Sequence, residues 1–274
     1  MKFLKPNIAI LLIAATLFSC QKDDETQVET KSEVSKEVLS KISSLSLNTY
    51  GVTPFSKTNL DGSKEDGYLV EGCIAMSKEH LNNMEMYGGI TSEQYRTTNL
   101  VAAPRTISVI GYTGGSNALT TNMRNGLQSA INRYNNLGLS IRFTLSFATS
   151  TNADIVVYRE PSQTGAGGQA GFPSGGAPYK WVQIFAGLDN YSSALNSHVI
   201  AHEIGHCIGF RHTDWFSRQS CGQNTNEGTA GIGAVHIPGT PTGYDSTSYM
   251  RACFNGSETG AFNSNDVTAL NYLY

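Results

Sequence analysis

The chain has 274 residues and a formal net charge of −3, with no run of Lys or Arg side chains. It therefore offers neither a footprint for nucleic acid nor a polybasic membrane surface. Only 15% of its residues are charged, and it is rich in Gly, Ser, Thr and Asn, which is typical of a loop-rich secreted protein. The length allows one sizeable core and a further segment outside it.

The N-terminus predicts export from the cell. Lys2 and Lys5 precede an apolar stretch, residues 7–18, that is too short to span a membrane as a helix. The stretch ends in Leu17-Phe18-Ser19-Cys20, which resembles a bacterial lipobox. That resemblance implies cleavage before Cys20 and lipidation of its thiol. An ordinary secretory signal with a chance cysteine is the alternative.

A lipidated Cys20 would anchor the protein to a membrane. We therefore expect residues 1–20 to be a lipoprotein signal peptide and the protein to sit on the bacterial outer membrane. Residues 21–25, Gln-Lys-Asp-Asp-Glu, are similar to the surface-export signals of some Gram-negative lipoproteins, although a solvated tether has the same composition. No other segment is long and apolar enough to cross a bilayer.

The N-terminal third of the chain carries few regular patterns. Apolar side chains at near-helical spacing predict a short amphipathic helix within a polar tether: Val34, Val38, Ile42 and Leu45. Residues 61–66 predict a turn, residues 68–74 a short strand, and residues 77–87 a helix that Ser77 begins. Residues 97–104 have no pattern and predict a linker.

Regular patterns begin near Ile107 and mix strands with helices. An apolar strand starts there, and a helix follows with apolar side chains every four residues: Leu119, Met123, Leu127 and Ile131. Gly138 ends that helix. Residues 139–147 then alternate strictly between apolar and polar side chains, which predicts a half-buried strand.

The remaining pattern predicts two more strands and two more helices. The strands are at residues 155–158 and 181–185, and a Gly-rich loop at residues 165–176 separates them. One helix starts near Ser193, and Ser264 or Asn265 caps a last helix that runs to the C-terminus. The long stretch between these two helices lacks periodicity.

The helix from Ser193 carries the motif with the clearest chemistry, HEIGHCIGFRH over residues 202–212. His202 and His206 lie one helical turn apart on one face, so both imidazoles can reach a single zinc ion. Gly209 can adopt the positive φ that ends a helix, which brings in His212 as a third ligand. Three protein ligands leave a fourth position open, as in catalytic zinc sites. A helix with satisfied surface histidines is the alternative.

The extended pattern HExxHxxGxxH resembles that of the metzincin proteases, which follow it with a Met-turn. Ser248-Tyr249-Met250 fits the Met-turn, with Met250 as an apolar floor beneath the histidines. The run HEIGHCIGFRHTDW, with the later HIPGTP and DVTALNYLY, is similar to the bacterial HEIGH metallopeptidases. The resemblance covers residues 68–274 and is densest around the zinc helix.

This resemblance implies an α+β fold, with a mixed twisted sheet, a long helix and the zinc helix above an irregular C-terminal half that ends in a helix. Residues 21–66 are then a tether and the start of a pro-segment, residues 67–105 a pro-segment with a zinc-blocking motif, and residues 106–274 the catalytic domain. The family binds extended peptides along an edge strand of the sheet. We expect that strand near residues 181–185 or the turn just after.

The resemblance also implies a secreted, lipid-anchored zinc endopeptidase that is made as a latent precursor. Glu203 would act as general base and then deliver the proton to the leaving amine. Astacins place a Tyr two residues after the Met of the Met-turn, where this chain has Ala252, so the oxyanion donor is left open. Asp214 could orient a ligand histidine, or could be a surface charge at the helix exit.

Two other functions stay open at this point. One is a surface binding lipoprotein that retains its metal site without turnover, although the intact Glu203 argues against a decayed site. The other is a zinc hydrolase of a non-peptide amide. A structural calcium ion would suit a loop-rich chain, but no ligand spacing specifies one.

Residues 68–74, YLVEGCI, resemble the astacin latency motif FxGD, in which a pro-segment Asp occupies the open zinc position. This chain has Cys73 in place of the acid. A thiolate is a better zinc ligand than a carboxylate, so we predict that Cys73 blocks the zinc of the proenzyme. A disulfide and a buried small hydrophobic side chain are the competing interpretations.

Cysteine pairing bears on that prediction. With Cys20 lipidated, four cysteines remain in an oxidising compartment and allow three pairings: Cys73, Cys207, Cys221 and Cys253. Cys221 and Cys253 flank the Met-turn region and are the pair we predict. A bridge between Cys207 and Cys73 would exclude the zinc switch.

Overall fold

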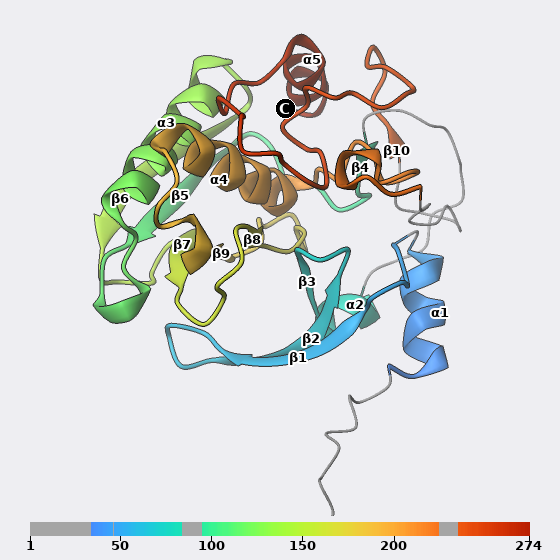
Figure 1. Ribbon diagram of the computed structural model, residues 1–274, viewed down its shortest axis with the longest axis horizontal. Coiled ribbons are helices and arrows are strands. Elements are labelled where there is room, and N and C mark those ends of the chain that lie inside the picture. Colours follow the sequence, from blue (N-terminus) through green and yellow to red (C-terminus); the bar gives the residue numbers. More distant parts are fainter. Residues whose placement is uncertain (1–33, 46, 84–94, 225–234) are drawn as a thin grey trace, which may run out of the picture. The chain divides into compact units, whose positions relative to one another are not determined.

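The computed structural model describes residues 34–45, 47–83, 95–224 and 235–274. Their main sheet has five strands in the spatial order β6-β5-β7-β9-β8 (Figure 1). The strands are β5 (Arg105–Tyr112), β6 (Ile141–Ala148), β7 (Ile155–Glu160), β8 (Gly168–Gln169) and β9 (Trp181–Phe185). The first four in space pair in parallel, whereas β8 runs antiparallel to β9 at the edge. The mixed α+β fold is thus as predicted.

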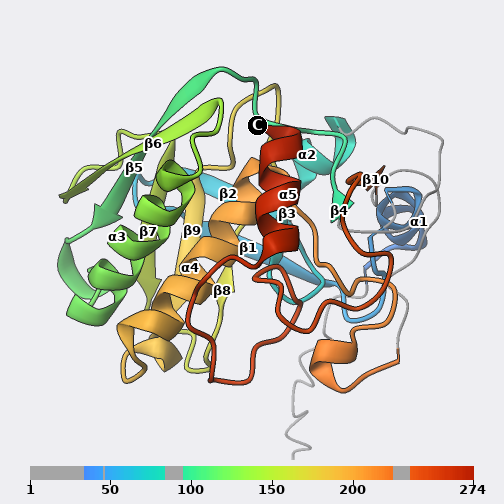
Figure 2. The ribbon, with the colours of Figure 1, turned by 90° about the horizontal axis from the view of Figure 1, so that it is seen from above.

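Two long helices cover one face of this sheet. α3 (Thr121–Asn136) and α4 (Ser193–Ile208) lie side by side (Figures 1 and 2), and their apolar side chains share one hydrophobic cluster with β5 and β7. Thr120 and Ser192 cap the two helices, because each hydroxyl accepts a hydrogen bond from a first-turn N–H. α4 is buried on every side from Leu195 to Ile208, so its motif residues lie inside the protein.

The other face of the sheet carries the N-terminal region. α1 (Lys36–Ser44) precedes a three-stranded antiparallel sheet of β1 (Thr53–Thr58), β2 (Lys64–Val70) and β3 (Ile74–Ser77), followed by α2 (Lys78–Asn83). The predicted amphipathic helix is α1, whose Ile42 joins a hydrophobic cluster with β2, β3 and Phe172. Leu60, in the β1–β2 turn, packs against Tyr158 and Trp181 on the main sheet.

The prediction of one continuous strand over residues 68–74 was wrong. β2 ends at Val70 and β3 begins at Ile74, so the chain reverses between them. Glu71 and Gly72 have φ values of +54° and +81°, which place both in the left-handed region. Apolar side chains on both sides of a reversal look like one continuous strand in the sequence, and this concealed the turn.

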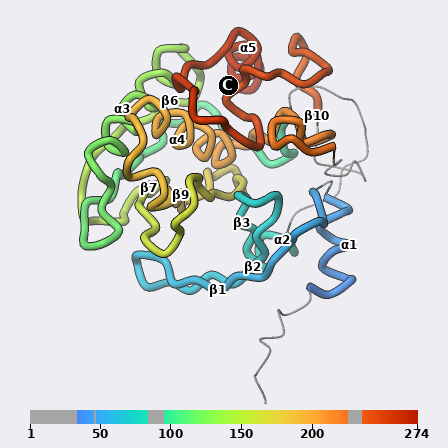
Figure 3. The backbone as a smooth tube through the Cα atoms, viewed as in Figure 1, coloured from blue at the N-terminus to red at the C-terminus, as the bar shows by residue number. Residues whose placement is uncertain are grey.

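The described residues between α4 and α5 (Ser264–Leu273), 209–224 and 235–263, are mostly irregular (Figure 3). They include β10 (Val235–His236), which pairs with β4 (Tyr95–Arg96). Single 3-10 turns occur at η1 (Gly115–Asn117), η2 (Ala186–Leu188) and η3 (Gln219–Cys221). Asn263 caps α5 in a capping box with Asp266, one residue before the predicted cap.

The substrate edge predicted from the sequence also needs correction. β9 lies inside the sheet between β7 and β8, so residues 181–185 are not an edge strand. The edge is β8, which lies within the predicted Gly-rich loop. Two residues, Gly and Gln, are too few to show the alternation that identifies a strand.

The predicted signal peptide with Cys20, and the acidic run after it, lie outside the described residues. Among the helices that the structure does describe, none is both long and apolar enough to cross a membrane.

Candidate active site

The site is built on the last turns of α4. His202 and His206 project from one face of the helix, and Glu203 lies beside them. Gly209 ends the helix at φ +114°, and a Cβ there would lie 2.6 Å from the Leu100 side chain. The chain can turn at this point because the residue is glycine, and the turn brings His212 back to the two helical histidines.

Four ligand atoms converge, from His202, His206, His212 and Cys73, all within 4.8 Å of one another. The Nε2 atoms of His202 and His206 are 3.0 Å apart, and the Cys73 sulfur lies 3.3 Å from Nε2 of His212 and 3.6 Å from that of His206. In a tetrahedral zinc site, Zn–N bonds of about 2.0–2.1 Å and a Zn–S bond of about 2.3 Å separate the ligand atoms by about 3.3–3.6 Å. The two sulfur distances match this spacing and the His202–His206 pair is slightly closer, so the donor set of three imidazoles and one thiol suits zinc.

His202 and His206 are placed to be neutral imidazoles with a free lone pair on Nε2, which is the form that binds a metal ion. Nδ1 of His202 lies 2.9 Å from the main-chain oxygen of Tyr249, and Nδ1 of His206 lies 2.8 Å from that of Phe210. A proton on each Nδ1 leaves the lone pair of Nε2 directed at the cluster. Burial, with the neighbouring imidazoles, lowers the pKa of His206 to about 3 and that of His202 well below its ordinary value. Both rings are thus neutral.

Met250 lies beneath the histidines, against α4. A Cβ on Gly205 would meet the Met250 sulfur at 2.5 Å, so the second glycine of the motif is a packing requirement. Asp266 of α5 holds the turn: it accepts hydrogen bonds from the Ser248 hydroxyl at 2.7 Å and the Tyr249 N–H at 3.2 Å. The sequence reading missed Asp266. The spacing of Asn263 and Asp266 in the sequence fits an Asn-x-x-Asp capping box, and this pattern could have identified Asp266.

Glu203 is buried, with only 2% of its surface exposed, and lines a cavity of about 450 Å³. Burial raises the pKa of its carboxyl well above the usual range. Its Oε2 atom has no hydrogen-bond partner within the described part of the chain. Apolar side chains of Phe185, Val199 and Phe254 line the same cavity. A carboxylate in such a place is suited to take up a proton.

Cys73 reaches the cluster from the N-terminal region. Its main chain is paired to the edge of the sheet, because Ala170 N donates to Cys73 O over 2.9 Å and Ala75 N donates to Ala170 O over 2.6 Å. Cys73 and Cys207 are both free thiols, so the structure lacks the bridge between them that would exclude a zinc switch. Burial raises the pKa of the Cys73 thiol, an effect that a bound cation would oppose.

Comparisons with known proteins bear on this geometry. A model of the dual-action HEIGH metallo-peptidases matches residues 68–274. The chain belongs to this family. It is a zinc metallopeptidase, and its substrate is a peptide or protein.

The chain is also similar to solved structures. Two structures of myroilysin match this HEIGH metallopeptidase at 15% and 16% identity, with TM-scores of 0.42 and 0.40. The matches cover 65% and 62% of this chain and 82% and 83% of the myroilysin chains. Among curated proteins, the search finds no match.

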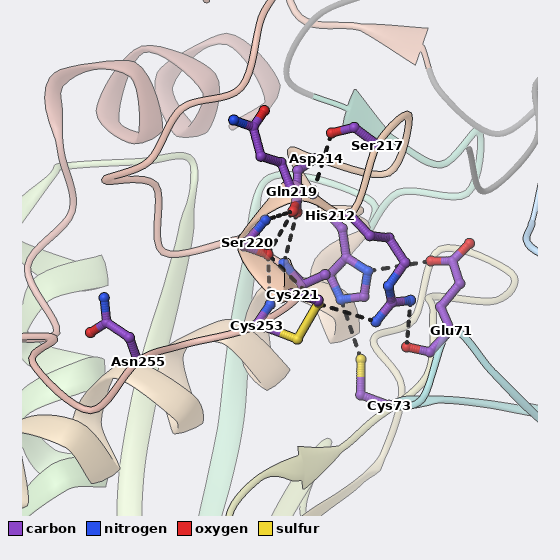
Figure 4. The surroundings of a disulfide bond; sticks show 12 residues. Glu71, Cys73, His212, Asp214, Ser217, Gln219, Ser220, Cys221, Cys253 and Asn255 are labelled. Atoms are coloured by element: carbon purple, nitrogen blue, oxygen red, sulfur yellow. Dashed lines mark hydrogen bonds and ion pairs between the residues drawn. A yellow bond between two sulfur atoms is a disulfide. The ribbon is translucent and has the colours of Figure 1, made fainter. Parts of the chain in front are cut away.

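The disulfide in the HEIGH metallopeptidase joins Cys221 to Cys253 (Figure 4). Asp214 supports this region. Its Oδ2 accepts hydrogen bonds from both the N–H and the hydroxyl of Ser220, and its Oδ1 accepts one from Ala252 N. Both oxygens of the Asp214 carboxylate thus accept hydrogen bonds from the disulfide loop. These contacts favour a structural role for Asp214 over the orientation of a ligand histidine.

A different carboxylate approaches a ligand histidine of the HEIGH metallopeptidase. Glu71 Oε2 lies 3.4 Å from Nδ1 of His212, while Glu71 Oε1 lies 2.6 Å from the Arg211 guanidinium. The sequence reading missed Glu71 because it belongs to the N-terminal region, far along the chain from the motif.

Two further buried polar side chains lie near the histidine cluster, Tyr249 in the core and His198 at the wall of the cavity that Glu203 lines. The Tyr249 hydroxyl lies 3.3 Å from that of Tyr134 in the core, so it does not face the cavity. His198 is buried one turn before His202, with its ring 6.4 Å from that of Phe254, and burial lowers its pKa to about 4.

Proposed function

We propose that this metallopeptidase is a latent endopeptidase in which His202, His206 and His212 hold the zinc and Glu203 is the general base. The observation that carries the proposal is the fit of the three Nε2 atoms and the Cys73 sulfur to a zinc tetrahedron. Zinc bound there supplies Lewis acidity to a water molecule and to a peptide carbonyl.

Glu203 then has two tasks. Its unpartnered Oε2 takes the proton of the attacking water, and the same carboxyl delivers that proton to the leaving amine. The raised pKa of Glu203, which follows from its burial, brings the carboxyl closer to the range in which both transfers are efficient. The extended substrate lies along β8 and Ala170, the residue after it, with which the main chain of residues 73–75 now pairs.

Latency follows from the same arrangement. The Cys73 sulfur takes the fourth ligand position, so the water that Glu203 would deprotonate has no place. Main-chain pairing of Cys73 and Ala75 with Ala170 holds the sulfur there. Removal of the pro-segment frees the fourth position and the β8 edge together.

The hydrogen bonds of β4 bear on where the pro-segment ends. Arg211 N donates to Tyr95 O over 2.9 Å, and Thr97 N donates to Gly209 O over 2.8 Å. Residues 95–97 therefore support the loop that carries His212. These contacts favour a boundary between residues 83 and 95 over the boundary at residue 105 that the sequence predicted.

Export and anchoring rest on the sequence alone. Residues 1–20 form a lipoprotein signal peptide in this proposal, and Cys20 carries the lipid that attaches the enzyme to the bacterial outer membrane. The acidic residues 21–25 favour display at the cell surface.

Casein cleavage tests the enzyme, with protein that lacks residues 1–20, before and after limited trypsin treatment. We expect cleavage only after trypsin, and none in a Glu203→Gln variant that still binds zinc. The Cys73→Ser variant should cleave casein without trypsin. Zinc-loaded protein that cleaves nothing in any form would contradict the proposal.

A cobalt-substituted sample tests the ligand directly. We expect unprocessed protein to show a sulfur-to-cobalt charge-transfer band that Cys73→Ser lacks. A spectrum without this band would rule out Cys73 as a ligand.

A further inference from the structure

We propose that Glu71 is a positioning residue for the zinc ligand His212. Glu71 approaches Nδ1 of this histidine, while Cys73, two residues later, approaches Nε2. The inference rests on the proposed roles of His212 and Cys73 and extends them. Removal of the pro-segment then does two things: it opens the fourth ligand position, and it weakens the hold on the metal.

The contacts of His212 carry the inference (Figure 4). The Cys73 sulfur lies 3.3 Å from Nε2, and the Glu71 Oε2 atom lies 3.4 Å from Nδ1, on the opposite side of the ring. The side chains of Glu71 and His212 are both fully buried. Glu71 Oε2 makes no hydrogen bond within the described residues, so it faces Nδ1 as a buried charge at ion-pair distance.

The backbone is shaped for this double contact. Glu71 has φ +54°, which is uncommon for a residue with a side chain, and Gly72 follows at φ +81°. The resulting turn between β2 and β3 lets residues 71 and 73 approach one imidazole from two directions. A block of the zinc needs the sulfur alone, whereas this turn also places the Glu71 carboxylate near the ring of His212.

The charge of Glu71 is secured by groups that do not touch the metal. Its Oε1 atom lies 2.6 Å from Arg211 and accepts a hydrogen bond from Asn48 N over 3.2 Å. Arg211 is itself fully buried and is the neighbour of His212 in sequence. The carboxylate is thus held as an anion, and its second oxygen, Oε2, is left for His212.

The other two ligand histidines have different supports. Nδ1 of His202 faces the carbonyl of Tyr249, and Nδ1 of His206 faces the carbonyl of Phe210. Both carbonyls belong to the catalytic region and stay after processing. Glu71 departs with the pro-segment, whatever other contacts His212 keeps.

A carboxylate on the distal nitrogen of a ligand histidine fixes the ring and makes the other nitrogen a stronger base. Loss of such a partner weakens metal binding about 10–100-fold. In the latent form, two pro-segment side chains therefore help to retain zinc. Cys73 would bind the metal, and Glu71 would orient the ligand His212.

The experiment measures the rate at which zinc passes from unprocessed protein to a chromogenic chelator. We expect Glu71→Gln to release zinc about tenfold faster or more than the parent protein. Glu65→Gln is the matched control, since Glu65 lies in the same pro-segment and pairs with Lys57 and Tyr179, away from the metal. An unchanged rate in Glu71→Gln would overturn the inference.

The cobalt spectrum separates positioning from simple loosening of the pro-segment. In Glu71→Gln the sulfur-to-cobalt band should persist while the ligand-field bands shift, because Cys73 stays and His212 moves. Loss of the sulfur band would show that Glu71 only docks the pro-segment, which also overturns the inference. Glu71→Asp provides a second variant, which keeps the charge near Arg211 but withdraws it from Nδ1, and it should also speed release.

Cys73→Ser distinguishes this inference from the proposed latency. If Cys73→Ser leaves both the cobalt spectrum and the release rate unchanged, the latency proposal fails, while faster release from Glu71→Gln would still support Glu71. If Cys73→Ser accelerates zinc release and Glu71→Gln does not, the latency proposal is supported and the proposed role of Glu71 is wrong.

Discussion

The Tyr249 N–H donates to the Asp266 carboxylate over 3.2 Å, so α5 holds the turn of Ser248, Tyr249 and Met250, the candidate Met-turn. The same carboxylate accepts hydrogen bonds from the Ser248 hydroxyl and from Asn263 N. Through these bonds, one buried side chain fixes both the start of α5 and the turn that contains Met250.

Replacement of Asp266 by Asn should destabilise the fold. The amide oxygen of Asn can take the place of Oδ2 and keep the Tyr249 and Asn263 N–H groups paired, but its NH₂ group then replaces Oδ1 and faces the Ser248 hydroxyl, whose proton loses its carboxylate acceptor. Such a loss costs about 1–3 kcal/mol of unfolding free energy. Urea unfolding of Asp266→Asn measures it. Thr268→Ala in the same helix is the control and should change stability by under about 0.5 kcal/mol. Equal stability of both variants would contradict the role of Asp266.

His198 should make stability depend on pH. Burial lowers its pKa in the folded protein to about 4, whereas an exposed His titrates at about 6.5. Between these values the unfolded chain binds the extra proton, so stability falls as pH drops from about 6.5 to 4. The full effect is about 3 kcal/mol. Urea unfolding at several pH values should show a smaller loss in His198→Gln. Parallel curves for the two proteins would rule out this contribution.

Gly205→Ala tests the packing of the Met-turn. The new Cβ would lie 2.5 Å from the Met250 sulfur and 3.2 Å from the Tyr249 hydroxyl, so one of them must move. Overpacking of this kind costs about 1–3 kcal/mol. Combining it with Met250→Ala makes room, and the double variant should be more stable than the sum of the two single effects predicts. Simple additivity in urea unfolding would show that the two residues do not compete for space.

Removal of zinc should expose one thiol and leave another protected. With the metal bound, neither Cys73 nor Cys207 should react with iodoacetamide. After chelation Cys73 should be alkylated, faster at higher pH because burial raises its thiol pKa and the thiolate is the reactive form. Cys207 is fully buried in α4 and should stay unmodified. Mass spectrometry of the peptides identifies the labelled residue. Rapid labelling of Cys73 in the zinc-loaded protein would contradict its role as a ligand.

Local patterns accounted for much of the fold. The alternation of residues 139–147 became β6, and the four-residue apolar repeat from Leu119 became α3. Both succeeded because the local backbone geometry of a helix or a strand sets the period of its buried face. The predictions failed where the segment was short or reversed, at β8 and at the turn after Val70.

The sequence by itself determined the three histidines, the general-base candidate and the turn between them, because residues 202–212 form one helix and its C-terminal turn. Only the tertiary structure decided what faces these ligands. Cys73 is separated from His212 by 139 positions, and Glu71 from Arg211 by 140. No local period relates residues so far apart, since their contact depends on how the N-terminal region packs against the main sheet. The identity of the candidate zinc ligands was therefore local information, whereas the carboxylate near His212 and the course of the edge strand depend on packing.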